Sequence, residues 1–508
     1  MIIDNDKITY VGSFDETKIP VNATVIDLEN RIVVPGFIDG HVHILHFGQS
    51  LQKVDLISCT SLELIREKIR AYAQANPDVP QILCRGWIQA STNGVALASM
   101  LDDLDPRPIF IDAFDFHSMW CSTSALEEMK LENISDPPGG TIHRDKDGKP
   151  SGLLDETALT NIVWPYLETL YSHEDKLSAL DATFKSYTAT GYTGLVEMGM
   201  DENLWELLNE YRQDSSIPFH IGAHWLVPFA SDQEENFRYV DRAIELKQKF
   251  AEPDFCILGI KLICDGVVDG CTAALTQPYT GKSDPVDPIW PENMLQEVVQ
   301  RADAGGLQCA IHAIGDLAVH QVINVLSRAG TPGRRHRIEH LEMTRSEDAK
   351  RLGNLGITAS VQPVHSDPAL FKAWPSLIGK DRCKRAFAYK EFLDGGAPLS
   401  IGTDAPTAPH FPFPNLYNAT TRRSALEPDS TDTVNPEYSI SLVEAATAAT
   451  QGAAYARFAD SWTGSLQEGL NADFIIVDMQ WNPDMLLEAK VSQTWYRGSK
   501  VYDSNSAV

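Results

Sequence analysis

Eight apolar runs rich in β-branched residues, separated by segments long enough for helices, constrain the fold of this 508-residue chain most strongly. Such an alternation is typical of parallel strands joined by crossover helices, and helices are expected at 293–304 and 442–454. Eight β/α units favour a closed barrel over an open doubly wound sheet, because a barrel leaves no strand edge unpaired and uses strands that are apolar on both faces. The expected fold class is therefore α/β, a (β/α)8 TIM-type barrel. The runs span 32–43, 192–198, 219–227, 257–265, 307–314, 336–341, 357–364 and 398–404.

The first and second runs are separated by nearly 150 residues, far more than a crossover helix needs. This stretch contains strand-like pieces at 81–88 and 108–115 and a polar, turn-rich segment at 136–152. We therefore expect an inserted lobe at about 75–175. Because the lobe follows the first strand, it would lie over the mouth of a barrel domain that spans 32–455.

Both ends of the chain contain short segments in which polar and apolar residues alternate. One lies near the N-terminus and three lie beyond the last expected helix, at 7–11, 474–477, 494–496 and 501–502. Chain ends that pair with each other need no further element. These segments predict a small β-sandwich domain made of residues 1–31 and 456–508.

Composition narrows the class of function. The chain has 42 Lys and Arg against 70 Asp and Glu, a formal net charge of -28, which disfavours binding to nucleic acid or to anionic lipid. The eight cysteines are scattered without a CxxC pair and are interpreted as reduced thiols. The first residues do not resemble a signal peptide, and no apolar run has membrane length. We expect a cytoplasmic enzyme that acts on a small molecule, and the sequence leaves open whether it forms a homo-oligomer.

The strongest chemical signal is the segment GFIDGHVH at 36–43, at the end of the first run. Residues two apart in a strand point to the same side, so His41 and His43 can both present nitrogens to one metal ion. Two histidines can also fall this close together by chance. The pair alone leaves both interpretations open.

Four other polar residues stand near the ends of later runs, where the active sites of barrel enzymes lie. They are Lys261, His312, His340 and Asp404. Taken singly, each has an ordinary explanation, such as a lysine that reaches solvent, a hydrogen-bonded core histidine or an aspartate that caps a helix. Six such residues on five strands are hard to place by accident. Together they predict nitrogen and oxygen ligands for zinc or a similar divalent ion.

Short motifs along nearly the whole chain resemble the amidohydrolase superfamily, and specifically its YtcJ-like branch, which includes N-substituted formamide deformylases. The pattern of paired histidines with a terminal aspartate is specific to the superfamily, and its combination with the lobe motifs is specific to the branch. The motifs are PGFIDGHVH (35–43), GW (86–87), DFH (115–117), SAL (124–126), GIKLICDG (259–266), CAIHAIGD (309–316), RIEH (337–340), SVQP (360–363), GTDAP (402–406), GSLQEG (464–469) and NAD (471–473).

The resemblance implies a site with two divalent ions, expected to be Zn²⁺. In such a site His41, His43 and Asp404 hold one ion, and His312 and His340 hold the other. The resemblance further implies that Lys261 is carbamylated and bridges both ions. A carbamate would turn an expensive buried cation into an anion that partly neutralises the two divalent charges.

The expected reaction is hydrolysis of a carbon-nitrogen bond in an amide-like substrate, with metal-activated hydroxide as nucleophile and Asp404 as general base and then acid. A first alternative is a mononuclear deaminase of a purine-like or pyrimidine-like ring. Such deaminases resemble one another in having a glutamate three residues after the fifth-strand histidine, a position held here by Gly315. A second alternative is a scaffold that kept the barrel but binds no metal.

The walls of the substrate pocket are expected to come from the lobe and from the loops after the strands. For each candidate, packing in the core is about as good an explanation as contact with substrate. Asp265 could orient a substrate N–H group or only stabilise the turn at Gly266. The candidates are Trp87, His117, Trp120, Trp225, Asp265 and His365.

Overall fold

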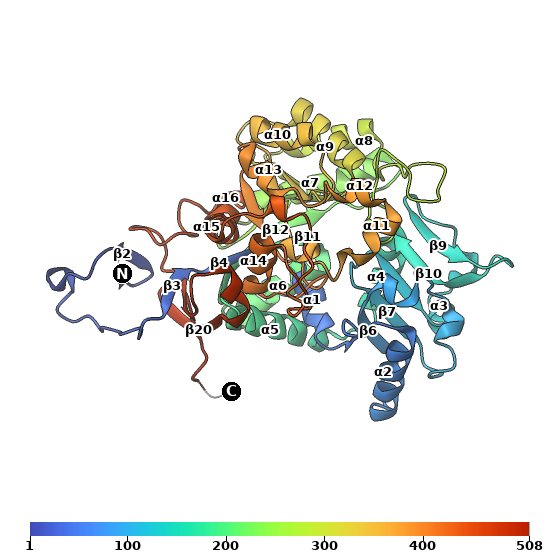
Figure 1. Ribbon diagram of the computed structural model, residues 1–508, viewed down its shortest axis with the longest axis horizontal. Coiled ribbons are helices and arrows are strands. Elements are labelled where there is room, and N and C mark those ends of the chain that lie inside the picture. The colour runs from blue at the N-terminus through green and yellow to red at the C-terminus, as the bar shows by residue number, and fades with distance from the viewer. Residues whose placement is uncertain (507–508) are drawn as a thin grey trace.

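The computed structural model describes residues 1–506, and eight parallel strands at its centre form a nearly closed barrel (Figure 1). Neighbouring strands pair in the order in which they occur along the chain. The first and last strands meet at a single bridge, where the N–H of His43 donates to the carbonyl oxygen of Ala405 over 3.0 Å. The predicted (β/α)8 barrel is confirmed. Its strands are β4 (Phe37–Val42), β11 (Tyr192–Met200), β12 (His220–Leu226), β14 (Phe255–Ile263), β15 (Gln308–Ala313), β16 (Arg337–His340), β17 (Thr358–Val361) and β18 (Leu399–Ile401), and the short β13 (Ala251–Glu252) pairs antiparallel with β14.

Helices cover the outside of the barrel because each presents one apolar face to the strands. In α9 (Asp316–Ala329), for example, buried residues recur every three or four positions from Ala318 to Leu326. None of the helices within residues 1–506 is long and apolar enough to cross a membrane. The other helices of this layer are α1 (Ile44–Ser50), α5 (His173–Ala189), α6 (Glu202–Asp214), α7 (Gln233–Lys249), α8 (Glu292–Ala304), α10 (Ser346–Leu355), α13 (Tyr389–Asp394), α14 (Pro412–Thr421), α15 (Leu442–Thr447) and α16 (Ala453–Ala456). The short α11 (Trp374–Leu377) and α12 (Lys380–Cys383) lie in the segment between β17 and β18.

The two helices expected from the sequence are both present. The first, at 293–304, is α8. The second, at 442–454, is not a regular α-helix, because a π-helical turn at Ala448–Gly452 separates α15 from α16. A π-helical turn inserts a residue into the helical repeat without ending the helix, and the sequence pattern does not reveal it.

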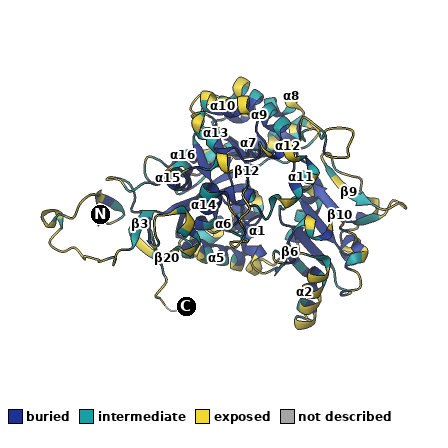
Figure 2. Ribbon diagram, viewed as in Figure 1, coloured by how far each residue is buried: buried dark blue, intermediate teal, exposed yellow. Residues whose placement is uncertain are grey.

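The barrel strands are buried on both faces (Figure 2). In β12, the side chains of Ile221, Ala223 and Trp225 belong to the large apolar cluster between the strands and the helices. His224 and Leu226 alternate with them, and Leu226 lines the cavity at the mouth of the barrel. Burial on both faces explains why the strands appear in the sequence as nearly continuous apolar runs.

The first run, predicted as one strand at 32–43, is in fact two strands in two sheets. Residues of β3 (Ile32–Pro35) pair antiparallel with the C-terminal strand β19, and β4 then enters the barrel. Gly36 lies at the junction, where a Cβ atom would come within 2.3 Å of the Thr193 side chain. The apolar pattern runs through both strands because both are buried.

A terminal antiparallel sheet forms from both ends of the chain, as predicted. Its strand order is β21, β20, β19, β3, so the N-terminal contribution is β3 rather than the segment 7–11. That segment instead forms a hairpin, whose Ile8 N–H donates to the carbonyl of Leu470 over 2.9 Å. The elements are β1 (Ile2–Asp4), β2 (Lys7–Tyr10), β19 (Phe474–Asp478), β20 (Lys490–Tyr496) and β21 (Ser499–Asp503).

The inserted lobe after β4 is a six-stranded sheet with its own apolar core, at the right of Figure 1. Its sheet begins with β5, which contains Val54. The limits predicted for the domains stay predictions. Ser61 begins the long helix of the lobe by accepting a hydrogen bond from the N–H of Leu64. The strand order is β5, β6, β7, β8, β10, β9, and the elements are β5 (Val54–Asp55), α2 (Leu62–Ala75), β6 (Ile82–Trp87), β7 (Ile109–Ala113), β8 (Ser118–Cys121), α3 (Thr123–Glu128), β9 (Gly140–Arg144), β10 (Pro150–Glu156) and α4 (Trp164–Glu168).

Candidate metal centre

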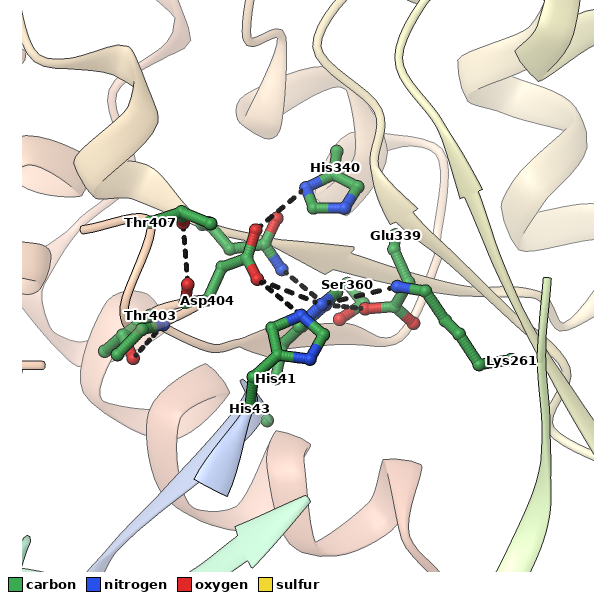
Figure 3. Close-up of polar contacts among 12 residues, drawn as sticks. His41, His43, Lys261, Glu339, His340, Ser360, Thr403, Asp404 and Thr407 are labelled. Atoms are coloured by element: carbon green, nitrogen blue, oxygen red, sulfur yellow. Dashed lines mark hydrogen bonds and ion pairs between the residues drawn. The ribbon is translucent and has the colours of Figure 1, made fainter. Parts of the chain in front are cut away.

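The two histidines of the first barrel strand face one carboxylate at the mouth of the barrel (Figure 3). His41 lies in β4 and His43 follows it directly, so both side chains point to the same side. Nε2 of His41 lies 3.3 Å from Oδ1 of Asp404, and Nε2 of His43 lies 3.2 Å from the same oxygen. The structure thus brings together three side chains that come from opposite ends of the barrel sequence.

Asp404 is held in place by its backbone. Its φ of +58° is uncommon for a residue other than glycine, and its N–H donates to the carbonyl of His41 over 2.7 Å. Burial raises the pKa of its carboxyl, but His41 and His43 outweigh this and hold that pKa well below its usual value. Oδ1 is buried and makes no hydrogen bond with any residue in 1–506. Three ligand atoms that lie within 4.8 Å of one another, one of them a buried carboxylate oxygen without a hydrogen bond in residues 1–506, fit a divalent cation.

His41 is oriented by a buried glutamate that the sequence did not single out. Its Nδ1 donates to Oε2 of Glu339 over 2.7 Å, which leaves Nε2 free to bind a metal. Glu339 is fixed in turn by Arg337, whose Nε donates to Oε1 over 2.5 Å. Burial, followed by the charge of Lys261, holds the pKa of His41 well below its usual value, so the ring is neutral, as a ligand must be. The motif RIEH carries Glu339, but its role depends on a partner far away in the sequence.

A second buried carboxylate joins the first and last barrel strands. Asp39 accepts hydrogen bonds from the N–H of Thr403 over 2.9 Å, from its hydroxyl over 2.5 Å and from the hydroxyl of Tyr187 over 3.1 Å. Burial raises the pKa of Asp39 to about 6. These contacts fix the segment that carries Asp404 against the strand that carries His41.

His312 and His340 end two neighbouring strands and lie beside this group. Their ring centres are 4.4 Å apart, and the ring of His340 lies 5.0 Å from that of His41. His340 has a φ of +76°, and its buried Nδ1 has no hydrogen-bond partner within residues 1–506. Both histidines therefore stand where a second ion could be held.

Lys261 projects from β14 into the same group. It is 3% exposed, and its Nζ lies 3.4 Å from Nε2 of His41. No carboxylate within residues 1–506 forms an ion pair with it. Burial lowers the pKa of its amine, which favours the uncharged form. The structure therefore brings all six predicted ligands together.

The six side chains line one cavity of about 330 Å³ between the barrel and the lobe. Glu197, from β11, also lines it and was not predicted. Its carboxylate accepts a hydrogen bond from the N–H of Ile44 over 2.6 Å, and burial raises its pKa to about 7. Much of the remaining wall is apolar and includes Leu45, Phe116, Leu159, Trp164, Phe229 and Ile289. The cavity is suited to a small molecule with an apolar part.

Known proteins share this arrangement of elements. The sequence profile of the amidohydrolase family matches residues 24–502. The chain belongs to this family. It is 27% identical to the putative amidohydrolase YtcJ of Bacillus subtilis (strain 168), over 99% of this chain and 96% of that protein. It is 24% identical to the N-substituted formamide deformylase of Arthrobacter pascens, over 99% and 94%.

A solved structure gives the same result. An uncharacterized metal-dependent hydrolase from Pyrococcus furiosus superposes with a TM-score of 0.72 at 25% sequence identity, and 95% of each chain is covered. The predicted membership of the amidohydrolase superfamily, with YtcJ-like relatives over the full length, is confirmed. The protein is a metal-dependent hydrolase of this superfamily, and His41, His43 and Asp404 are its candidate metal site.

Two of the predicted substrate contacts of this amidohydrolase lie at cavities. His117 lines the main cavity, and burial, which lowers its pKa, is outweighed by Glu156, so that the pKa rises to about 9. His365 lines a smaller adjoining cavity of about 70 Å³, where its Nε2 lies 3.2 Å from Oγ1 of Thr407. Together with His340 and Glu342 it also offers ligand atoms within 4.8 Å of one another.

Two other predicted contacts of the amidohydrolase lie in the core of the lobe. Trp87 and Trp120 are fully buried, with ring centres 5.3 Å apart. Their indole N–H groups donate to Oγ1 of Thr92 and to the carbonyl of Leu97. Neither lines the main cavity, because both side chains fill the apolar interior that the inserted sheet needs.

The last two predicted contacts do not line the main cavity either. Trp225 faces the helix layer, because the alternation of β12 sends Leu226 and not Trp225 to the mouth. Asp265 is fully buried and accepts hydrogen bonds from three backbone N–H groups, those of Ala274, Ile314 and Gly315. These hydrogen bonds join the loops that follow β14 and β15, with Oδ1 of Asp265 3.6 Å from Nε2 of His312, and both proposed roles of Asp265 stay predictions.

Proposed function

We propose that this amidohydrolase cleaves a carbon-nitrogen bond in a small amide-like substrate. The observation that carries the proposal is the convergence of Nε2 of His41 and Nε2 of His43 on Oδ1 of Asp404, which is buried without a hydrogen bond within residues 1–506, at the wall of a cavity of about 330 Å³. The similarity to a protein named as a formamide deformylase supports the choice of bond.

The ligands are proposed to hold two zinc ions. His41, His43 and Asp404 would bind the first, and His312 and His340 the second, with a carbamate on Lys261 between them. Nitrogen and oxygen ligands of this kind suit zinc. The uncharged amine that burial favours at Lys261 is the form that reacts with carbon dioxide.

The ions would supply a water molecule of lowered pKa and would polarise the substrate carbonyl. Asp404 would accept a proton from the attacking water and deliver it to the leaving nitrogen, acting as base and then as acid. Its backbone hydrogen bond to His41 keeps the carboxylate at the reacting centre. The apolar wall excludes bulk water from the bond that breaks.

The first alternative, a mononuclear deaminase, has no support at the expected position. A side chain at Gly315 would place Cβ within 2.0 Å of the carbonyl oxygen of Ala274, so the backbone leaves no room for a proton-carrying glutamate there. The second alternative, a metal-free scaffold, would leave Oδ1 of Asp404 and Nδ1 of His340 buried without partners.

Metal analysis combined with a substrate screen tests the proposed function. Purified protein is assayed on N-substituted formamides, N-acyl amines and cyclic amides, beside the variant Asp404→Asn. We expect bound zinc and hydrolysis of at least one substrate in the native protein, with activity at least a hundredfold lower in the variant because the general base is lost. Bound metal without activity on any of these substrates would show that the class of reaction is wrong.

A further inference from the structure

The inserted lobe contributes a buried carboxylate to the wall of the catalytic cavity. Glu156 is the last residue of β10, and its N–H donates to the carbonyl of His117 over 3.0 Å. Nδ1 of His117 donates to Oε2 of Glu156 over 2.8 Å. The ring of His117 lies 5.1 Å from that of His312, so the pair stands directly beside the proposed metal ligands.

The other carboxylate oxygen of Glu156 has no protein partner. Oε1 is buried, and no donor within residues 1–506 forms a hydrogen bond with it. The whole residue is 9% exposed and lines the main cavity. A buried carboxylate oxygen without a donor costs free energy. Its place on the cavity wall indicates that a bound molecule supplies the donor.

The surrounding backbone is shaped to hold this carboxylate. Glu156 and Phe116, which precedes His117, have φ values of +55° and +62°, in the left-handed region that residues other than glycine seldom adopt. A Cβ atom on Gly266 would come within 2.0 Å of Oε1 of Glu156. The carbonyl of Gly266 in turn lies 3.4 Å from Nε2 of His312. The carboxylate therefore occupies a fixed place against the strand ends.

We propose that Oε1 of Glu156 accepts a hydrogen bond from the N–H of the substrate, so that the enzyme selects amides that carry one N-substituent over those that carry two. The inference rests on the proposed function and names its substrate class. The N-substituent would pack against the apolar wall formed by Phe116, Trp164 and Phe229. Glu156 is then a specificity-determining residue, which the lobe contributes to the barrel.

A pair of matched substrates tests this role. The native enzyme and Glu156→Gln are compared on N-cyclohexylacetamide and on N-cyclohexyl-N-methylacetamide, which differ only at the amide nitrogen. Glutamine keeps the shape of the side chain but turns an N–H group towards the donor of the substrate. We expect kcat/KM for the N–H substrate to fall by about tenfold to hundredfold, the range for a hydrogen bond to a charged group, and kcat/KM for the N-methyl substrate to stay within about twofold.

Binding provides a readout that needs no turnover. Calorimetry on the zinc-loaded protein with N-cyclohexylmethanesulfonamide and its N-methyl derivative, which contain no hydrolysable amide, should show a preference for the N–H compound that Glu156→Gln abolishes. Failure of the native enzyme to hydrolyse any amide would overturn the proposed function and leave this comparison valid. Equal affinity of the native protein for the two sulfonamides would overturn the role of Glu156.

The matched control is Glu168→Gln. Glu168 lines the same cavity, but its oxygens are already bound by Lys176 over 2.7 Å and by Gln49 and Asn203 over 3.0 Å each. We expect the ratio of kcat/KM between the two amides to stay unchanged in this variant. An equal loss on both amides in Glu156→Gln, at unchanged metal content and thermal stability, would show that Glu156 has only a structural role.

Discussion

Lys261 illustrates how one residue can be costly for the fold and useful for the site. Its ammonium group would lie in the barrel interior without a carboxylate partner, and an isolated buried charge is strongly unfavourable. Burial resolves part of this cost by lowering the pKa of the amine. Formation of a carbamate removes the remaining cost of burial only if cations lie next to it, because the carbamate is itself a buried charge. The residue is therefore best explained together with bound metal.

The variant Lys261→Met tests this explanation. Methionine fills a similar volume without a charge, so we expect the free energy of unfolding of the metal-free protein to be maintained or raised. We expect the zinc content, measured by mass spectrometry, to fall from two ions to one per chain. The control Lys247→Met removes a partly buried lysine outside the cavity, which donates to the carbonyl of Leu258, and should keep both ions. Two ions in Lys261→Met would contradict the bridging role.

The residues of the site differ in how well the sequence revealed them. A charged or imidazole side chain at the end of an apolar run is unusual, and this contrast marked all six proposed ligands. Asp39 and Glu339 also stand in predicted runs, and Glu156 stands outside them, but the sequence does not show their roles, because these come from partners that only the folded chain brings near. Trp87 and Trp120 were predicted to contact substrate but lie in the core of the lobe. An aromatic residue has the same sequence pattern in a core as in a pocket.

At the scale of elements, the loop before α9 shows how closely the backbone segments approach each other around the site. Gly315 is the N-cap residue of this helix, two residues after β15, and its α-carbon packs against the backbone of Ala274. The N–H of Gly315 also donates to the buried Asp265 over 2.8 Å. The position of the helix relative to His312 thus depends on a residue without a side chain.

Gly315→Ala should accordingly destabilise the fold. The new Cβ would lie 2.0 Å from the carbonyl oxygen of Ala274, a backbone atom that cannot move independently. We expect a loss of about 1–3 kcal/mol, seen as a lower urea midpoint. Gly270→Ala is the matched control, because its nearest neighbours are side-chain atoms at 3.3 Å. Equal midpoints for the two variants would show that the backbone at Gly315 adapts.

The elements themselves were largely predictable, and the main error concerns pairing. Eight apolar runs predicted eight strands because a barrel strand is buried on both faces. The first run was taken as one strand because β3 and β4 are both apolar and continuous in sequence, although they belong to different sheets. Which strand a segment pairs with depends on distant residues, and no local pattern records it.

At the scale of the whole molecule, the barrel and the lobe line one cavity, and the terminal sheet supports the barrel strand that carries His41. The barrel supplies the proposed ligands, the lobe supplies His117, Glu156 and the aromatic rings of Phe116 and Trp164, and the terminal sheet anchors β3 just before β4. Figure 1 shows the lobe and the terminal sheet on opposite sides of the barrel. A bound ion would therefore stabilise the native state as a whole.

Removal of metal should lower the stability of the entire protein. A ligand that binds only the folded state at a thousand times its Kd stabilises that state by about 4 kcal/mol. We expect dialysis against a chelator to lower the apparent Tm by several degrees and stoichiometric Zn²⁺ to restore it, as measured by scanning calorimetry. The same treatment of His41→Ala should change the apparent Tm much less. An unchanged Tm in the native protein after verified metal removal would contradict this expectation.

The contact between the first and last barrel strands, β4 and β18, has a consequence for how the site forms during synthesis of the chain. His41 emerges from the ribosome early, but the backbone and carboxylate of Asp404 that complete its site are added only after most of the chain has been made. A growing chain thus carries only part of the candidate metal site through nearly all of its synthesis. The full set of ligands forms only when the last strand docks against the first, so binding of the metal ion would stabilise the closed barrel over the open one.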